Sequence, residues 1–349
     1  MTSKERTKIA LSRKIPDRVP MCADFVPEVR KKLIEHFKAA DYYEMLVKLG
    51  CDVLVAGAGI GASFYYSTDD EYVCPWGCTW KYFRNDTGSY TEIINHPLAD
   101  DEDGKKLAAY RTPDPNSDEV IAPLRDVITR YGQTHYICGF LACTIFEASW
   151  YLHGLQDTIT DMMERPEYVN ALFDKVMDFS LQAGLRFIDE GVDMIWLGDD
   201  VGMQHGMMMS PNTWREFLKP RLKKLIDAFK AKNPDVLIAY HSCGYIMPII
   251  DELIEVGVDV LNPIQPRSMD PAVVKKEFGD RLSFWAAIDI QETLPRGTIE
   301  QIRDEVLLRR KTIGEGGGYL MGPAHNVQSD TSVENILALF KAASELATY

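Results

Sequence analysis

Eight short apolar segments, several of them followed by a stretch of helical periodicity, constrain the fold of this chain more than any other feature. The apolar segments are rich in β-branched residues and occupy residues 19–25, 52–57, 135–140, 193–198, 236–240, 258–263, 282–288 and 318–322. Amphipathic stretches with a helical pattern lie at residues 166–191, 210–231, 298–314 and 331–347. Apolar runs that alternate with helices are typical of a parallel sheet whose two faces are both covered.

Eight such units predict a (β/α)8 barrel, also called a TIM barrel, in a single domain over residues 1–349. That length would also fit two domains, but no tandem repeat, low-complexity segment or linker divides the sequence. A doubly wound open sheet is the alternative architecture. It is disfavoured because no glycine-rich dinucleotide-binding fingerprint follows the early strands.

One segment departs from the alternation. Residues 71–98, "EYVCPWGCTWKYFRNDTGSYTEIINHPL", are aromatic, turn-rich and alternating in polarity. This pattern is typical of a β-hairpin. We therefore expect a hairpin insertion after the second strand, over one end of the barrel.

Charge and composition exclude several classes of partner. The net charge of -14 argues against binding to nucleic acid. No apolar run approaches the ~20 residues of a membrane span, and the polar N-terminus does not resemble a signal peptide. The seven cysteines are expected to be mostly free thiols. These features predict a cytoplasmic enzyme with a small-molecule substrate and no contact with membranes.

In barrels of this class the active site lies at the carboxyl ends of the strands, so the residues that directly follow the strands are candidates. Asp199 and Asp200 are adjacent, and we expect one of them to line the site while the other caps the next loop or helix. The predicted catalytic residues are Asp199, Asp200 and Asp289. The predicted substrate-binding residues are Asp24, Phe140, Gln204, Asn262, Gln291 and Asn326.

The fifth apolar segment ends in a candidate metal-binding pair, His241 and Cys243. Two residues apart in an extended chain, their side chains point to the same side, and imidazole and thiolate both bind zinc. His325, in "GGGYLMGPAHNV", is expected at the same end of the barrel and could be a third ligand. The alternative is a barrel rim with one buried thiol and two hydrogen-bonded histidines. On the residues alone, the alternative is at least as well supported.

Five sequence blocks connect the chain to a known family. They begin at Pro16 ("PDRVPMCADF"), Met208 ("MMSPNTWREFLKPRLKKLID"), His241 ("HSCGYIMPIIDELIEVGVDVLN"), Ala286 ("AAIDIQETLPRGTIEQIRDEV") and Gly316 ("GGGYLMGPAHNVQSDTSVENI"). With these blocks the chain resembles the uroporphyrinogen decarboxylase superfamily over nearly its whole length. The resemblance implies a (β/α)8 barrel, and members of the superfamily often form homodimers.

The resemblance is closer to one branch than to the other. True decarboxylases carry an arginine-rich motif after the first strand, but this chain has "CADFVPEVRKK" at residues 22–32. They also have an aspartate after the second strand, where this chain has "VAGAGIGAS". The cobalamin-linked methyltransferases of the superfamily share the His-x-Cys pair as zinc ligands, with a cysteine as third ligand near the end of the barrel. His325 falls at that position.

That branch implies zinc as cofactor, a corrinoid carried by a partner protein, and a role in one-carbon metabolism. Zinc would hold a substrate thiol as thiolate, or act as a Lewis acid on a methyl ether or alcohol. Our first hypothesis is therefore a zinc-dependent, corrinoid-linked methyltransferase with a small thiol or a methoxylated or methylated substrate. The alternatives are a decarboxylase in tetrapyrrole metabolism and a non-catalytic barrel that binds a corrinoid or tetrapyrrole.

Overall fold

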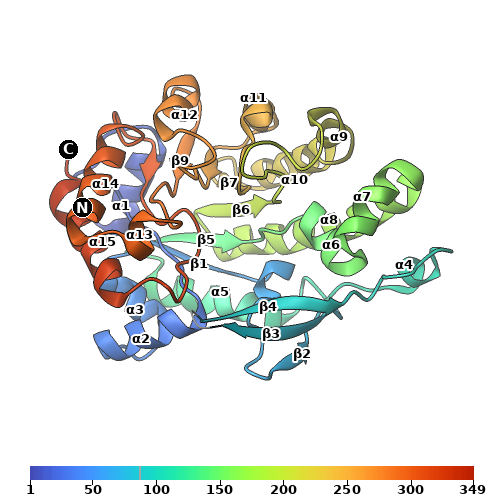
Figure 1. Ribbon diagram of the computed structural model, residues 1–349. Coiled ribbons are helices and arrows are strands. Elements are labelled where there is room, and N and C mark those ends of the chain that lie inside the picture. The colour runs from blue at the N-terminus through green and yellow to red at the C-terminus, as the bar shows by residue number, and fades with distance from the viewer. Residues whose placement is uncertain (86–87) are drawn as a thin grey trace.

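The computed structural model describes residues 1–85 and 88–349 and has a curled parallel sheet surrounded by helices (Figure 1). Within the described residues this sheet has seven strands, in the order β1-β5-β6-β7-β8-β9-β10. Their bounds are β1 Val53–Gly57, β5 Tyr136–Phe140, β6 Met194–Gly198, β7 Leu237–His241, β8 Val260–Asn262, β9 Ser283–Trp285 and β10 Tyr319–Leu320. Each strand pairs in parallel with the next strand of this sheet along the chain, which is the arrangement of a TIM-barrel-like fold.

Helices connect the strands and cover the outer face of the sheet (Figure 1). The α-helices of the first half are α1 Ser3–Leu11, α2 Pro27–Phe37, α3 Tyr42–Leu49, α4 Lys105–Ala109, α5 Asp118–Tyr131, α6 Phe146–His153, α7 Leu155–Glu164 and α8 Pro166–Glu190. Those of the second half are α9 Pro211–Phe217, α10 Lys219–Lys232, α11 Ile250–Val256, α12 Pro271–Phe278, α13 Thr293–Arg296, α14 Ile299–Lys311 and α15 Val333–Leu346. Short 3-10 helices lie at Ile60–Ser63 and Met247–Ile249.

The predicted first strand, residues 19–25, forms isolated bridges instead of a regular strand. Met21 makes a parallel bridge with Met321, directly after β10. The amide of Met321 donates to Pro20 O at 2.8 Å, and the amide of Asp52, directly before β1, donates to Met21 O at 2.7 Å. A regular ladder is interrupted because Pro20 has no N–H to donate. The segment is nevertheless hydrogen-bonded to both edges of the seven-stranded sheet.

The segment predicted as a hairpin forms a separate antiparallel sheet of three strands, β2 Glu71–Val73, β3 Thr79–Asn85 and β4 Gly88–Asn95. One of its faces is buried, and Trp80 on that face is 1% exposed. The Trp80 ring meets the ring of Tyr151 in α6 edge to face, at a centroid distance of 5.8 Å. The small sheet is therefore attached to the helix that follows β5.

Two apolar clusters pack against the parallel sheet, one inside the ring and one between the sheet and the helices. Side chains alternate between the two faces of a strand, so every second residue points into the ring. The inward cluster includes Val53, Cys138, Met194, Ala239, Val260 and Leu320, and Leu11 of α1 packs against it. The outward cluster fills the space between the sheet and the helices, with fully buried rings such as Phe173, Phe187 and Phe229. The interior of the ring is thus packed rather than open.

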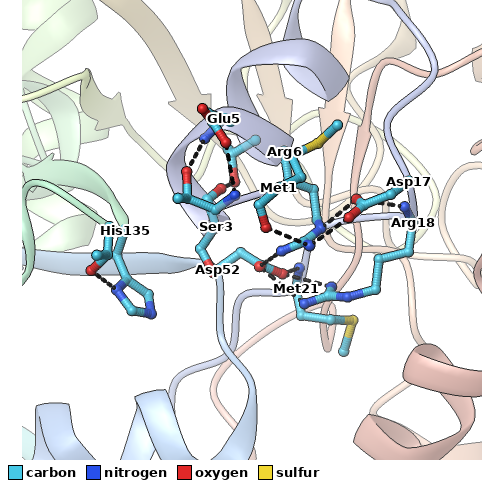
Figure 2. A network of polar contacts seen from close by, with 12 residues as sticks. Met1, Ser3, Glu5, Arg6, Asp17, Arg18, Met21, Asp52 and His135 are labelled. Atoms are coloured by element: carbon cyan, nitrogen blue, oxygen red, sulfur yellow. Dashed lines mark hydrogen bonds and ion pairs between the residues drawn. The ribbon is translucent and has the colours of Figure 1, made fainter.

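A charge network fastens α1 to the amino end of the ring (Figure 2). Asp52, fully buried, accepts hydrogen bonds from Arg6 Nη1 at 2.7 Å and from Arg18 Nη1 at 2.7 Å. Arg6 also pairs with both carboxylate oxygens of Asp17, at 2.7 Å each. The Met21 amide donates to Asp52 as well. Every charge in this network has an opposite charge in contact, so the amino end is closed and fixed.

Among the described residues, no helix is at once long enough and apolar enough to cross a membrane.

Candidate metal and substrate site

A glycine allows the carboxyl ends of β6 and β7 to lie directly side by side. Gly198 is in register with His241 and has a φ of +149°. A Cβ at Gly198 would lie only 2.2 Å from the carbonyl oxygen of His241. Any other residue would push the strands apart, so glycine at this point fixes the position of the His241 backbone.

The three predicted metal ligands come together at this end of the sheet. The candidate ligand atoms of His241, Cys243 and His325 all lie within 4.8 Å of one another. Nε2 of His241 is 3.6 Å from Sγ of Cys243, and the two imidazole centroids are 6.0 Å apart. His241 and Cys243 are half-buried, whereas His325 is exposed. These three residues, called the ligand group below, are therefore reachable from the solvent side.

Asn262, at the end of β8, fixes the orientation of the His241 ring. Its Oδ1 lies 2.7 Å from His241 Nδ1, and its Nδ2 donates to the carbonyl of Trp285 at 3.4 Å. Because the amide nitrogen is directed to a carbonyl, the amide oxygen faces the imidazole and accepts its Nδ1–H. Nε2 then points to Cys243. Asn262 is 4% exposed, so its side chain contacts the ligand histidine rather than open solvent.

Electrostatic interactions in this group favour a charged pair. Burial lowers the pKa of His241, but the charges of Cys243 and Asp200 outweigh it, and the pKa is raised well above its ordinary value. Burial raises the pKa of Cys243, but the charge of His241 outweighs it, and the thiol pKa is lowered. Imidazolium and thiolate therefore stabilise each other, and the thiolate is the form of cysteine that binds metals.

The adjacent acids after β6 have separate environments. Asp199, 2% exposed, accepts from the amides of Ile145 and Glu147 at 2.9 Å and so caps the start of α6. Burial raises the pKa of Asp199 to about 7. Asp200 faces the ligand group: its Oδ1 accepts from the Cys243 amide at 2.7 Å and lies 3.3 Å from His241 Nε2. Burial raises the pKa of Asp200, but His241 outweighs it and brings the pKa to about 2.

The backbone of Asp24 is hydrogen-bonded to the chain segment that carries His325. The amide of Val327, two residues after His325, donates to the carbonyl of Asp24 at 2.9 Å. The Asp24 carboxylate is already occupied, because Oδ1 accepts from Arg30 Nη2 at 2.7 Å and from the hydroxyl of Tyr42. The Asp24 carboxylate is therefore part of an ion pair with Arg30 and is not free.

Four other predicted residues make contacts around the rim. Asp289 is 6% exposed, pairs with Arg267 at 3.2 Å and accepts from the Gln291 amide at 2.8 Å. The side chain of Gln204 donates to the carbonyl of Arg267 at 2.8 Å. Asn326 accepts at its backbone carbonyl from the side chain of Gln328 at 3.2 Å. These contacts order the loops after β6, β9 and β10.

Aromatic rings line the interior next to His241. The predicted residue Phe140 meets Trp196 edge to face at a centroid distance of 5.3 Å. Trp196 lies 5.6 Å from the His241 ring and 4.4 Å from Trp285. Phe140 and Trp196 are half-buried, and Trp285 is 4% exposed. The polar ligand group therefore lies next to an apolar surface formed by these aromatic rings.

Comparison with known proteins assigns the chain to a family. The sequence profile of the uroporphyrinogen decarboxylase family matches residues 76–346, which is well over half of the chain. The chain belongs to the uroporphyrinogen decarboxylase family. The family expected from the sequence blocks is thereby confirmed.

The relatives of this family member fall into two groups. The methylcobamide:CoM methyltransferase MtaA of Methanosarcina barkeri is 32% identical over 178 residues, 50% of this chain and 49% of the relative. The uroporphyrinogen decarboxylase of Chlorobium phaeobacteroides is 26% identical over 189 residues, 53% of this chain and 51% of the relative. The chain thus spans about half the length of the curated relatives it matches. Sequence identity is higher to the methyltransferase.

A solved structure extends the comparison to the whole fold. A methyltransferase from Methanosarcina mazei superposes with a TM-score of 0.74 at 18% sequence identity and covers 99% of both chains. At this identity the likeness concerns the fold. It supports the TIM-barrel-like architecture of the parallel sheet.

Sequence reasoning missed Glu147 of α6. This carboxyl group is 6% exposed; its Oε2 accepts from the Asp200 amide at 2.9 Å, and its Oε1 accepts from the hydroxyl of Tyr151 at 3.3 Å. Burial, with the charge of Asp200, raises its pKa well above the ordinary value. Tyr151 in turn lies 3.6 Å from Sγ of Cys143. An acid within the otherwise apolar stretch "FEASWYLH" was the available signal.

Two surface hollows lie elsewhere on the molecule. The larger, of about 800 Å³, is lined by residues of the 104–112 segment and of α8. The smaller, of about 330 Å³, lies between α3 and α15. His241, Cys243 and His325 line neither of these two hollows.

Proposed function

We propose that this family member is a zinc-dependent methyltransferase. It would move a methyl group between a corrinoid, carried by a partner protein, and a small thiol or a methoxylated or methylated substrate. The observation that carries the proposal is the convergence of His241, Cys243 and His325, whose candidate ligand atoms lie within 4.8 Å of one another. The higher identity to a methylcobamide:CoM methyltransferase than to a decarboxylase supports the same function.

The donor set fits zinc. Two imidazoles and one thiolate are ligand types that zinc prefers, and three protein ligands leave a fourth position for substrate. Bond lengths of ~2.0–2.3 Å at tetrahedral angles separate a nitrogen and a sulfur ligand by ~3.6 Å. The distance between His241 Nε2 and Cys243 Sγ is 3.6 Å. Bound zinc would supply a charge that holds a substrate thiol as thiolate or polarises an ether or alcohol oxygen.

The protein's own groups would orient the reactants and exclude water. Asn262 holds the His241 ring so that Nε2 faces the site. The Cys243 amide is fixed by Asp200, and the Asp200 amide is fixed by Glu147. The aromatic surface formed by Phe140, Trp196 and Trp285 would offer apolar contact to a methyl group. Asp200 and Asp289 remain our candidates for polar contact with substrate, whereas the buried Asp199 would hold the start of α6.

We further propose the arrangement of the whole chain. Residues 1–349 would form one domain, a (β/α)8 barrel in which residues 19–25 occupy the place of the first strand. Residues 71–95 would be an insertion over one end. The corrinoid-binding partner would reach the ligand group from the side where His325 is exposed. A homodimer stays a prediction from the family resemblance.

Metal analysis and a transfer assay test the function. We expect the purified protein to contain about one equivalent of zinc, and Cys243→Ala to lose both the zinc and the activity. Activity would be measured as methyl transfer from methylcobalamin to a small thiol such as coenzyme M. Wild-type protein without zinc, or full metal content in the Cys243→Ala variant, would overturn the metal site.

A decarboxylase is the second candidate, because decarboxylases of the same family match half of the chain. Direct assay with uroporphyrinogen distinguishes the two. We expect no turnover, since residues 22–32 contain a single arginine where decarboxylases carry several. Release of carbon dioxide from uroporphyrinogen would favour the decarboxylase.

A further inference from the structure

The turn "CPWGC" joins β2 to β3 and places two thiols opposite each other. Val73 pairs with Thr79 in the antiparallel ladder, so Cys74 and Cys78 are the next facing pair. The Cys74 amide donates to the Cys78 carbonyl at 3.0 Å, and the Gly77 amide donates to the Cys74 carbonyl at 2.9 Å. Gly77 has a φ of +81°, the left-handed conformation that closes a three-residue hairpin loop.

This arrangement suits a disulfide with little movement of the backbone. The α-carbons of a hydrogen-bonded antiparallel pair lie ~5.5 Å apart, and those of most disulfides lie ~5.5–6 Å apart. Both side chains share the buried face of the small sheet with Tyr72 and Trp80, which are two residues away along each strand. Cys74 is 3% exposed, and Cys78 is fully buried. Both are free thiols in this structure.

The two sulfur atoms have different surroundings. Sγ of Cys78 donates to the carbonyl of Tyr151 in α6, at 3.2 Å. A hydrogen bond with Cys78 lowers the pKa of the Cys74 thiol, whereas burial raises it. Further contacts with Ser63 and Trp80 bring this pKa to about 5. The contact with Cys74, together with burial, raises the pKa of Cys78. Cys74 is therefore the thiol that ionises first.

The indole of Trp80 gives independent evidence for a negative sulfur at this point. Its ring is 1% exposed, and among the described residues its Nε1 makes no hydrogen bond of ordinary geometry. A buried donor without a partner costs stability. A neutral thiol is a weak acceptor, but a thiolate on Cys74 would be a strong one for this N–H. The buried face thus favours the thiolate form of Cys74, which is the nucleophilic form.

Contacts from other elements hold the turn in place. The hydroxyl of Tyr110 donates to the Trp76 carbonyl at 2.8 Å. The Trp76 ring meets Phe179 of α8 edge to face, at a centroid distance of 4.6 Å. The turn is therefore fixed against the barrel, and the two thiols are kept close together in an orientation that favours their reaction with each other.

We propose that Cys74 and Cys78 are a redox-active pair, in which Cys74 attacks a small hydroperoxide and Cys78 completes a reversible disulfide. The oxidant is small because the pair is almost completely covered, so that bulky disulfides have no access to Cys74. The pair lies in the antiparallel segment, and the inference does not depend on the proposed zinc site.

The reaction balances in two steps. The Cys74 thiolate attacks the terminal peroxide oxygen, the O–O bond breaks, and the leaving oxygen takes up a proton as water or an alcohol. The sulfur of Cys78 then attacks the sulfenic acid on Cys74, and the S–S bond forms as the S–O bond breaks. The departing hydroxide takes the proton of Cys78 and leaves as water. Two thiols together lose two electrons, and one peroxide gains them.

Peptide mass analysis after treatment with hydrogen peroxide tests the proposal. The intact protein is oxidised, free thiols are blocked by alkylation, and the protein is digested. We expect the peptide that contains Cys74 and Cys78 to lose the mass of two hydrogens and to resist alkylation. Reduction with dithiothreitol should restore both thiols. A pair that stays unreacted, or that oxidises past the sulfenic acid without a disulfide, overturns the proposal.

Two variants separate the roles of the thiols. Cys78→Ser should stop at a sulfenic acid on Cys74, trapped with dimedone, whereas Cys74→Ser should form no sulfenic acid on Cys78. The matched control is Cys143→Ser, which removes a more exposed thiol and should leave the yield of the disulfide unchanged. Thermal melting checks that each variant is folded, and the wild-type result stands without them. A sulfenic acid on Cys78 in the Cys74→Ser variant overturns the assignment.

The dependence of the rate on pH reports the thiolate. Because the pKa of Cys74 is about 5, disulfide formation should change less than about twofold in rate between about pH 6.5 and about pH 8.5. An ordinary thiol would react roughly 50-fold faster at the higher pH. A rise of that size in the wild-type protein would overturn Cys74 as a preformed thiolate.

Discussion

Each end of the parallel sheet holds an aspartate in contact with cationic or metal-binding groups, and the two differ in what surrounds them. Asp52, before β1, is fully buried and contacts two arginines, Arg6 and Arg18 (Figure 2). Asp200, after β6, contacts His241 and the amide of Cys243. In the network around Asp52 every charge contacts an opposite charge, whereas at the carboxyl end a carboxylate, two imidazoles and a thiol lie close together.

We interpret the Asp52 network as structural and the group at the carboxyl end as the candidate functional site. The paired network fixes α1 and the chain before β1. At the carboxyl end His241 pairs with Asp200, and Cys243 and His325 add donor atoms of types that suit a bound cation. Helices and amino-end contacts thus stabilise the ring, and the candidate site lies at the carboxyl end, where TIM barrels carry their active sites.

Removal of the Asp52 charge should have the largest effect on stability. Asp52→Asn leaves Arg6 and Arg18 in partly buried positions without their shared partner. We expect the free energy of unfolding to fall by about 3–5 kcal/mol, measured by denaturant titration. Zinc affinity of the folded protein should be unchanged. A control variant, Asp227→Asn, removes an exposed carboxylate that pairs with Lys223 on α10 and should stay within about 0.5 kcal/mol of wild type. A loss below about 1 kcal/mol for Asp52→Asn would contradict a structural role for the network.

Asn262→Ala should weaken metal binding at the other end. The variant loses the acceptor that orients His241, and loss of such a partner typically costs ~10–100-fold in metal affinity. Chelator competition measures the change. Asn262→Asp keeps an acceptor oxygen and should retain most of the affinity. Unchanged zinc binding in Asn262→Ala would show that the hydrogen bond does not orient the ligand.

Glu147→Gln makes at the carboxyl end the same chemical change as Asp52→Asn at the amino end, and we expect a much smaller effect. Burial and the charge of Asp200 raise the pKa of Glu147, so the ionised form of this carboxyl group is less favoured than in an exposed glutamate and replacement by an amide removes less stabilisation. The change in unfolding free energy should be about 1 kcal/mol or less, measured by denaturant titration at pH 7. A loss as large as that of Asp52→Asn would contradict the weaker dependence on charge expected at Glu147.

Asp17→Asn should have the smallest effect, and one that depends on pH. The hydrogen bond from Arg6 lowers the pKa of Asp17, despite partial burial. A lowered pKa stabilises the fold above the unfolded value of ~3.9, and this contribution disappears as pH falls through the folded value. Because the side chain is 43% exposed, we expect ~0.2–1 kcal/mol near pH 7. The difference from wild type should vanish in acid, and a difference that persists below pH ~3 would contradict the ion pair.

The order of the strands and the end of the sheet that carries the candidate site could be predicted from the sequence. Apolar runs and helical periods are local patterns, so β5 at residues 136–140 and β7 at residues 237–241 fall within one residue of their predicted bounds. Pairing of β1 with β5, across the antiparallel segment, follows from the same alternation. The two-residue spacing at the end of β7 predicted that His241 and Cys243 would lie on one side.

The tertiary structure decided what the local pattern could not. The sequence predicted that only one of Asp199 and Asp200 would face the site, but which one depends on the start of α6, whose amides bind Asp199. Glu147 was missed because its partner, the amide of Asp200, is 53 residues away in the chain. The regular strand expected at residues 19–25 was wrong, since Pro20 interrupts the ladder.

What the sequence by itself determined is the class of fold, the family and the residues that follow each strand. Only the tertiary structure brought His325 to within 4.8 Å of His241 and Cys243, and Asp200 to 3.3 Å from His241. The physical reason is that periodicity fixes which side of a strand a residue occupies. The distance between residues on different strands depends on loop paths that have no period.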